Sequence, residues 1–406
     1  ISSEMIKFKP LEIEDYSDKD LKTYYNILRE AVIARANHNG KTWVSSSSGW
    51  DSSLILGMLV SEFGAENTGM ITGSMKYSEG TDVINKFEIN KIKKIGEFYG
   101  IRPKIVDLDF KNKKAPDYWK KVLPYYKSKH MYTYVTYNFA KLSDGLLNAG
   151  GEGQTVCNGE TSDSFHNFGF SQFATFFHTQ KSFTEYADKM NCYLYGPSFF
   201  KKVLNGTAER DRVFQIFKKM MSSVEFETEW NSKEEIIASY LFPLFYGSPR
   251  IPFAKTYKNP CLIKRGQKVV YDFPYRDYMP DVVSSISEDN MYSWFIYLYH
   301  SFHSQGSTVN IQKHAMESNG HNWRSPFNDY RMIEFLSRAP EKWGRGLELN
   351  NTKYPLKWVA KNKIKFPYEL LEEGPHSYLY DVIEGFSLFA EITYRSGVTE
   401  FFKETL

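Results

Sequence analysis

The sequence contains little cysteine and has almost no net charge. Only three cysteines occur in 406 residues, and none forms a CxxC pair, so the sequence predicts neither a disulfide framework nor a cysteine zinc site. Basic and acidic residues number 51 and 48, for a formal charge of +3, which argues against nucleic-acid binding driven by overall charge. The sparse cysteine usage is typical of a reducing compartment, and we expect a cytoplasmic protein.

Long hydrophobic runs are also missing. The longest aromatic and apolar run, residues 292–302, is interrupted by Ser293, His300 and Ser301, and it is shorter than a membrane span. The start of the sequence shows no basic segment followed by an apolar core, so no signal peptide is expected. Aromatic residues, by contrast, are abundant, with 31 Phe and 29 Tyr, and this composition excludes a disordered chain.

Short apolar segments alternate with helical patterns in the first part of the chain, which is typical of an α/β fold with a parallel sheet covered on both faces. Strands are predicted at residues 42–46, 68–72, 104–108 and 154–158. Helices are predicted at residues 20–36, 51–63, 81–99 and 132–147. In such folds ligands bind outside the carboxyl ends of the strands.

Helical patterns dominate from about residue 183 onward, with one hairpin-like interruption predicted at residues 261–271. We therefore predict an N-terminal extension (residues 1–20), an α/β core (residues 21–180) and a mainly helical half (residues 181–406) that packs on that core.

The most informative segment is SSGWDS (residues 47–52), which joins the first predicted strand to the next helix. Backbone N–H groups and the positive end of the helix dipole meet in such a loop, which suits a polyphosphate. The serines add hydroxyl donors, and Asp51 adds a carboxylate able to hold Mg²⁺ against phosphate oxygens. The alternative is a serine-rich turn with no ligand.

Three later segments accompany this loop in order. They are CNGETSDSF (residues 157–165), RSPFNDYR (residues 324–331) and TKYPLK (residues 352–357). The loop resembles the SGGxDS pyrophosphate loop of the N-type ATP pyrophosphatases, with Ser48 in place of the first glycine. The later segments resemble the GEGxDELFGGY, RxPFLDHR and TKYxLR/K segments of asparagine synthetase-like enzymes. Glu88 is a weaker match, to an acidic residue in the helix after the second strand.

The chain is therefore identified as resembling the asparagine synthetase-like family of the PP-loop superfamily, over roughly residues 20–367 and without the glutaminase domain. The resemblance implies a PP-loop ATP pyrophosphatase fold and an ATP-dependent, AMP- and pyrophosphate-forming ligase that adenylates a carboxylate and forms an amide. ATP and Mg²⁺ are the implied cofactors. Partners would be a small-molecule, sugar or peptide carboxylate and ammonia or an amine, with no nucleic acid and no membrane.

Residue roles follow from the matched positions. Glu160 and Lys353 would be catalytic, with Glu160 taking a proton from the amine and Lys353 neutralising the leaving pyrophosphate. Asp51 and Asp163 would hold the metal. The residues expected to bind ATP or pyrophosphate are Ser45, Ser46, Ser47, Ser48, Gly49, Trp50, Asp51, Ser52, Thr72, Gly159, Lys353 and Lys357.

Each assignment has a plainer structural alternative. Asp51 could be an ordinary acid of a first helical turn, Asp163 a helix cap, and Lys353 a solvated lysine. Arg324 and Asp329 are expected to form a structural ion pair or helix cap, and Glu88 to be a structural acid. Cys157, on a predicted buried strand, is expected to be an apolar filler rather than a nucleophile.

The source of the amine stays open. Roughly 20 residues precede the first family-like helix, too few for a glutaminase domain, so ammonia would come from solution, a separate subunit or a preceding part of the precursor. The amine could also belong to the substrate. Departures from the family at Thr161, Ser164 and residues 165–168 make simple aspartate an unexpected substrate.

Two other functions compete with this reading. One is a PP-loop adenylating RNA-modifying enzyme, which the missing CxxC pair and the near-neutral charge disfavour. The other is a degenerate, noncatalytic nucleotide-binding subunit, since Ser48 could crowd the phosphates where the loop needs close backbone approach.

Overall fold

The computed structural model describes residues 17–76, 83, 85–109, 115–131, 135–166, 192–220, 224–246, 251–255, 263–341, 343 and 352–372. Its contacts divide the chain into two compact units, each built from segments that are not consecutive. The sheet unit comprises residues 25–160, 308–329 and 356–406, and the helical unit comprises residues 1–24, 161–307 and 330–355. The consecutive parts expected from the sequence, residues 1–20, 21–180 and 181–406, stay a prediction.

Five parallel strands form the sheet, in the order β3-β2-β1-β4-β5. They are β1 (Thr42–Ser45), β2 (Thr68–Lys76), β3 (Lys104–Asp109), β4 (Thr155–Cys157) and β5 (Asn322–Arg324). The first four confirm the predicted strands, although β2 continues to Lys76 beyond the expected end at Thr72. The fifth was not predicted, and it comes from the half of the sequence expected to be helical.

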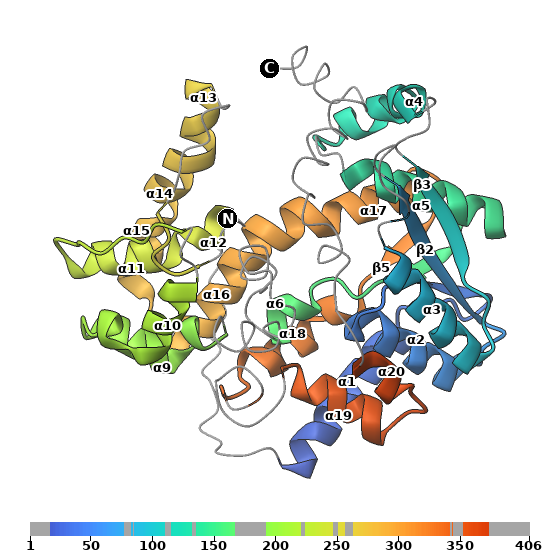
Figure 1. Cartoon of the computed structure of the whole chain (residues 1–406), viewed down its shortest axis with the longest axis horizontal. Coiled ribbons are helices and arrows are strands. Elements are labelled where there is room, and N and C mark those ends of the chain that lie inside the picture. Colours follow the sequence, from blue (N-terminus) through green and yellow to red (C-terminus); the bar gives the residue numbers. More distant parts are fainter. Residues whose placement is uncertain are drawn as a thin grey trace. The chain divides into compact units, whose positions relative to one another are not determined.

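Helices cover both faces of the sheet, which confirms the α/β architecture (Figure 1). Right-handed crossovers place α2 (Trp50–Phe63) and α3 (Lys86–Tyr99) on one face, where they pack on β1 and β2. The other face is covered by α5 (Val135–Gly150), which packs on β2 and β3, and by α17 (Asn310–Glu317), which packs on α5 and β5. Helix α4 (Ala115–Ser128), which was not predicted, contacts α5.

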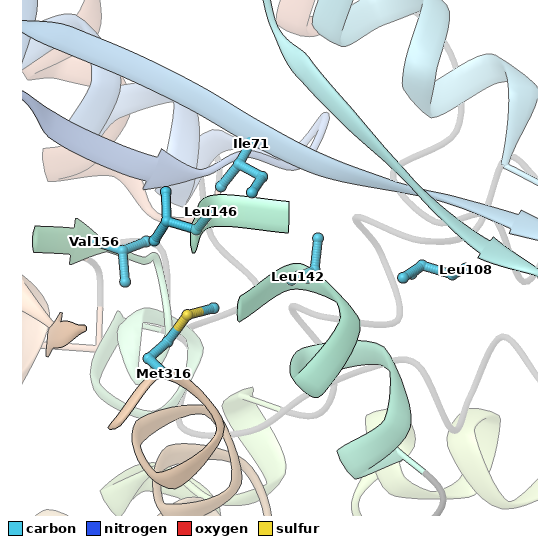
Figure 2. Close-up of a cluster of buried hydrophobic side chains, with 6 residues drawn as sticks. All are labelled: Ile71, Leu108, Leu142, Leu146, Val156 and Met316. Carbon is cyan, nitrogen blue, oxygen red and sulfur yellow. The ribbon is translucent and has the colours of Figure 1, made fainter. Parts of the chain in front are cut away.

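Apolar side chains from five of these elements meet between the sheet and the helices α5 and α17 (Figure 2). The cluster consists of Ile71 from β2, Leu108 from β3, Leu142 and Leu146 from α5, Val156 from β4 and Met316 from α17. Burial of these side chains fixes α17 against the sheet, and α17 carries a residue of the candidate site described below.

The helical unit is built around aromatic side chains. Its described elements are α6 (Ser162–His166), α9 (Pro197–Leu204), η2 (Ala208–Arg210), α10 (Arg212–Met220), α11 (Lys233–Leu241), α12 (Pro243–Tyr246), α13 (Lys264–Gln267), η3 (Lys268–Asp272), α14 (Phe273–Asp277), α15 (Met279–Ser285), η4 (Glu288–Asn290), α16 (Met291–Tyr299) and α18 (Tyr330–Ser337). Tyr240 is fully buried and lies with its ring 5.4 to 5.6 Å from those of Tyr195, Phe200 and Phe253.

The hairpin-like interruption predicted at residues 261–271 is wrong in its described part. Residues 264–277 form continuous helical turns, α13, the π-helix η3 and α14, and residues 261 and 262 lie outside the described residues. Gly266 has a low helix propensity and Val269 and Val270 favour strands, but helical hydrogen bonding overrides these weak propensities.

Five further helical stretches of the described residues connect the units or complete the sheet unit. Helix α1 (Asp18–Ile33), the π-helix η5 (His300–Val309) and α19 (Tyr354–Asn362) each contain a boundary between the units. The short helices η6 (Pro326–Asn328) and α20 (Tyr368–Glu372) belong to the sheet unit. Across the described ranges, no helix has the combined length and apolarity needed to cross a membrane.

Candidate functional site

The loop between β1 and α2 is held in shape by its own hydroxyl groups. The backbone N–H of Ser47 donates to Oγ of Ser52 at 3.0 Å, and the two serine hydroxyls lie 2.8 Å apart. The N–H of Gly49 donates to Oγ of Ser47 at 3.2 Å. Ser47 and Ser52 therefore close the two ends of the loop, so that its shape is set before any ligand binds.

Helix α2 begins in this loop without a side-chain cap. Gly49 is its N-cap, with extended backbone (φ −85°, ψ 163°), and no side-chain capping bond is made there. The positive end of the helix dipole thus faces the loop in the way an anion requires. Ser48 is buried and has a negative φ, so this position accommodates a serine without a left-handed backbone conformation.

The loop after β4 lies directly against this helix start. A Cβ atom built on Gly159 would be 2.8 Å from both Cβ of Asp51 and the backbone N of Ser52. Only glycine permits this approach. Strands β1 and β4 are neighbours at the point where the strand order reverses, which is where ligands bind in open α/β sheets.

Glu160, the next residue, is tied to two amide side chains. Its carboxylate Oε1 accepts a hydrogen bond from Nε2 of Gln312 at 2.7 Å. Oε1 of Gln312 accepts from Nδ2 of Asn158 at 2.6 Å, and Oδ1 of Asn158 accepts from the N–H of Glu160 at 3.2 Å. Gln312 was missed in the sequence, although an amide among the buried residues Ile311, Ala315 and Met316 of α17 is a usable signal.

A second carboxylate reaches the loop from α3. Oε1 of Glu88 accepts from the N–H of Ser48, and Oε2 accepts from Nδ2 of Asn85, both at 3.3 Å. Asn85 in turn bonds to Met75 and Gly73 of β2. Burial raises the pKa of Glu88 despite these two hydrogen bonds. Glu88 therefore contacts the loop itself, and its buried carboxyl group favours the protonated form.

Trp50 anchors the first turn of α2 by its side chain. The indole is buried, stacked on Phe366 at 5.9 Å and edge-on to Tyr368 at 5.1 Å. The ammonium group of Lys357, which is also buried, lies 5.3 Å from the indole centroid. The side chain of Trp50 thus supports the loop from the core, and its backbone is the part suited to contact a phosphate.

Ser45, Ser46 and Thr72, which were also predicted to bind ATP or pyrophosphate, lie in or next to strands β1 and β2. Ser46 bonds to β2 through its N–H and to Val44 through its hydroxyl, and Ser45 ends β1 opposite Ile71. Thr72 is buried within β2, at a position where β2 pairs with β3. The loop from Ser47 to Ser52 is therefore better placed for a ligand than Ser45, Ser46 or Thr72.

In the helical unit, Asp163 and Lys353 form an ion pair with 2.5 Å between Oδ1 and Nζ. Asp163 is the second residue of α6, and Lys353 directly precedes α19. Thr161 and Lys353 have positive φ angles of 72° and 58°, a strained conformation that side chains such as threonine rarely adopt. The two segments singled out in the sequence thus supply paired charges on strained backbone.

The structure also places three residues that were expected to have structural roles. Asp329 forms an ion pair at 2.9 Å, but with Arg35 of the segment after α1 rather than with Arg324. Arg324 donates to the carbonyl of Trp323. Cys157 is fully buried, and burial raises the pKa of its thiol to about 12, so it is an apolar filler as predicted.

No group of three or more metal-binding side chains occurs within the part of the chain that the structure describes. At phosphate sites Mg²⁺ is usually held by one or two carboxylates together with phosphate oxygens and water. Asp51, at the helix start, and Asp163, beside Lys353, are carboxylates of the kind that such an ion takes.

Comparison with models of known protein families finds no match to this chain, and comparison with curated proteins finds none either.

Proposed function

We propose that this chain is a PP-loop ATP-dependent ligase that activates a carboxylate as its adenylate and converts it to an amide. The observation that carries the proposal is the contact of Gly159 with Asp51. It brings a helix start suited to a triphosphate and a loop ending in Glu160 together at the switch point of the sheet. Phosphate binding and proton transfer can then occur side by side.

In the first step a carboxylate oxygen of the substrate attacks the α-phosphorus of ATP, and the bond to the β-phosphate oxygen breaks. Negative charge grows on the leaving pyrophosphate, which the loop N–H groups and hydroxyls of residues 47–52 would stabilise. Lys353 would supply a compact positive charge. Asp51 and Asp163 would hold Mg²⁺, which neutralises phosphate charge when bound.

In the second step the amine nitrogen attacks the acyl carbon, and AMP leaves with the carboxyl oxygen bonded to its phosphorus. The nitrogen gains a bond and must release a proton, which Glu160 would accept as a general base. The substrate is proposed to be a carboxylate other than aspartate, and the amine to be ammonia or an amine of the substrate.

The test is a ³¹P NMR assay of products. The protein is incubated with MgATP, a panel of carboxylates, and ammonium or amine donors. We expect AMP and pyrophosphate in equal amounts, dependent on one class of acid.

Lys353→Met and Asp163→Asn should abolish product, whereas the matched control Lys361→Met, on α19, should retain it. ADP and phosphate as products, or equal activity in all variants, would overturn the proposal, and binding of MgATP without turnover would identify a noncatalytic subunit.

A further inference from the structure

The hydrogen bonds around Glu160 form a closed ring. Its three members are the bond from the N–H of Glu160 to Asn158, the bond from Asn158 to Gln312, and the bond from Gln312 back to the Glu160 carboxylate. Gln312 is 4 % exposed and Asn158 is 3 % exposed, so water does not readily replace either amide. All three residues belong to the sheet unit.

The donors and acceptors of this ring can be arranged in only one direction. A backbone N–H can donate and cannot accept, so Asn158 must present Oδ1 to Glu160 and Nδ2 to Gln312. Gln312 must then present Oε1 to Asn158, which leaves its Nε2 hydrogens facing Glu160. The orientation of both amides therefore follows from the backbone, although amide oxygen and nitrogen are otherwise easily exchanged.

We infer that Gln312 is a positioning residue that, through this ring, holds Glu160 in its ionised form and in one orientation. A donor fixed toward a carboxylate stabilises the charged form over the protonated one. Asn158 and Gln312 do not titrate, and the hydroxyl of Ser325 donates to the backbone carbonyl of Glu160 at 3.1 Å. Asp51, which lies against Gly159, is a titratable side chain of the adjacent loop.

The role of Gln312 deepens the proposed function, because an ionised Glu160 is the state that a general base requires. It also explains why a glutamine from α17, far away in the sequence, reaches this loop. Trp323 of β5 supports the same amide, with Nε1 3.5 Å from Oε1 of Gln312. The ring thus connects the loop after β4 to two elements that the sequence did not place there.

The experiment is a ¹³C NMR titration of the whole protein labelled at glutamate Cδ, with the Glu160 signal assigned by its loss in Glu160→Gln. No metal or nucleotide is added, so the readout does not depend on activity. Gln312→Met keeps the side-chain size and removes the donor, and we expect the titration midpoint of Glu160 to rise by about one pH unit. The surface control Gln215→Leu should leave the midpoint unchanged.

Asn158→Leu provides a second variant should Gln312→Met fold poorly. It removes both hydrogen bonds of this amide without adding a charge, so Asn158 no longer orients Gln312 toward Glu160 and the midpoint should rise. An unchanged midpoint in both variants overturns the role of Gln312, whatever the activity. An inactive wild-type protein in which the midpoints shift as expected would instead refute the proposed function and keep the ring.

Discussion

Gly159 and Asp51 come so close that a methyl group on Gly159 would lie 2.8 Å from Cβ of Asp51 and from the N of Ser52. The two residues are far apart in the sequence, and each follows a different strand of the sheet. Their contact links the loop proposed to hold phosphate to the loop that carries Glu160.

Gly159→Ala should destabilise the protein by about 1–3 kcal/mol, because the added methyl group meets backbone that cannot yield without moving α2. Urea unfolding measures this loss, and calorimetric titration with MgATP should show weaker binding. Gly40→Ala, outside the loop, is the matched control, since its added Cβ meets only the side chain of Asn37, at 3.2 Å. Equal effects of the two substitutions would show that the contact does not constrain the loop.

Glu88 should make stability depend on pH. Because burial raises its pKa, the folded protein holds this proton to a higher pH than the unfolded chain does. The free energy of unfolding should therefore fall as the pH rises from the unfolded value through the raised one. Glu88→Gln removes this contribution, and urea unfolding measured from about pH 4 to about pH 8 should show a flatter profile.

The comparison for Glu88 is Glu97→Gln, an exposed position on the same helix α3. That variant should keep the wild-type slope. A wild-type slope in Glu88→Gln would mean that the buried carboxyl group does not contribute to the pH dependence.

His300 should act in the opposite direction. Burial lowers its pKa from 6.5 to about 4, and its ring packs against Phe165 at 5.4 Å. The unfolded chain binds the proton first, so stability should be lost as the pH falls from 6.5 through about 4, by up to about 3 kcal/mol. Thermal unfolding of His300→Gln across this range should show a smaller loss, whereas His38→Gln should behave as wild type.

The side chain of Trp50 should stabilise the fold rather than contact the ligand. Trp50→Ala removes a buried ring stacked on Phe366 and should cost about 3–5 kcal/mol in urea unfolding. Trp50→Phe keeps an aromatic ring and should cost less, with MgATP binding close to wild type. A large loss of nucleotide binding in Trp50→Phe with full stability would instead place the indole against the ligand.

The sequence predicted the elements with strong periodic signals. The strands at Thr42, Thr68, Lys104 and Thr155 and the helices α2, α3 and α5 were found because apolar residues recur at regular spacing. Strand β5 was missed because three residues, Asn322–Arg324, are too few to show a period, and only pairing with β4 makes them a strand. The two-unit division was missed for the same reason, since it depends on contacts between distant segments.

For the candidate site, motifs in the sequence pointed to the charged residues, but not to the amide side chains that hydrogen-bond around Glu160. The segments around Asp51, Glu160, Asp163 and Lys353 were picked out by their motifs. Gln312 was not, because a single glutamine in a short helix resembles any buried polar residue until its partners are known. Arg324 and Asp329 were expected to form a structural ion pair or helix cap, and the fold pairs Asp329 with Arg35.

The central claim is that the loop from Ser47 to Ser52 holds the phosphates of ATP. It is tested most directly by a crystal structure of the complex with Mg²⁺ and the α,β-methylene analogue of ATP, which cannot release pyrophosphate. We predict that the β- and γ-phosphates accept hydrogen bonds from the backbone N–H groups of residues 47–52, with Asp51 on the metal. A nucleotide bound elsewhere on the chain, with this loop empty at saturating ligand, would contradict the account.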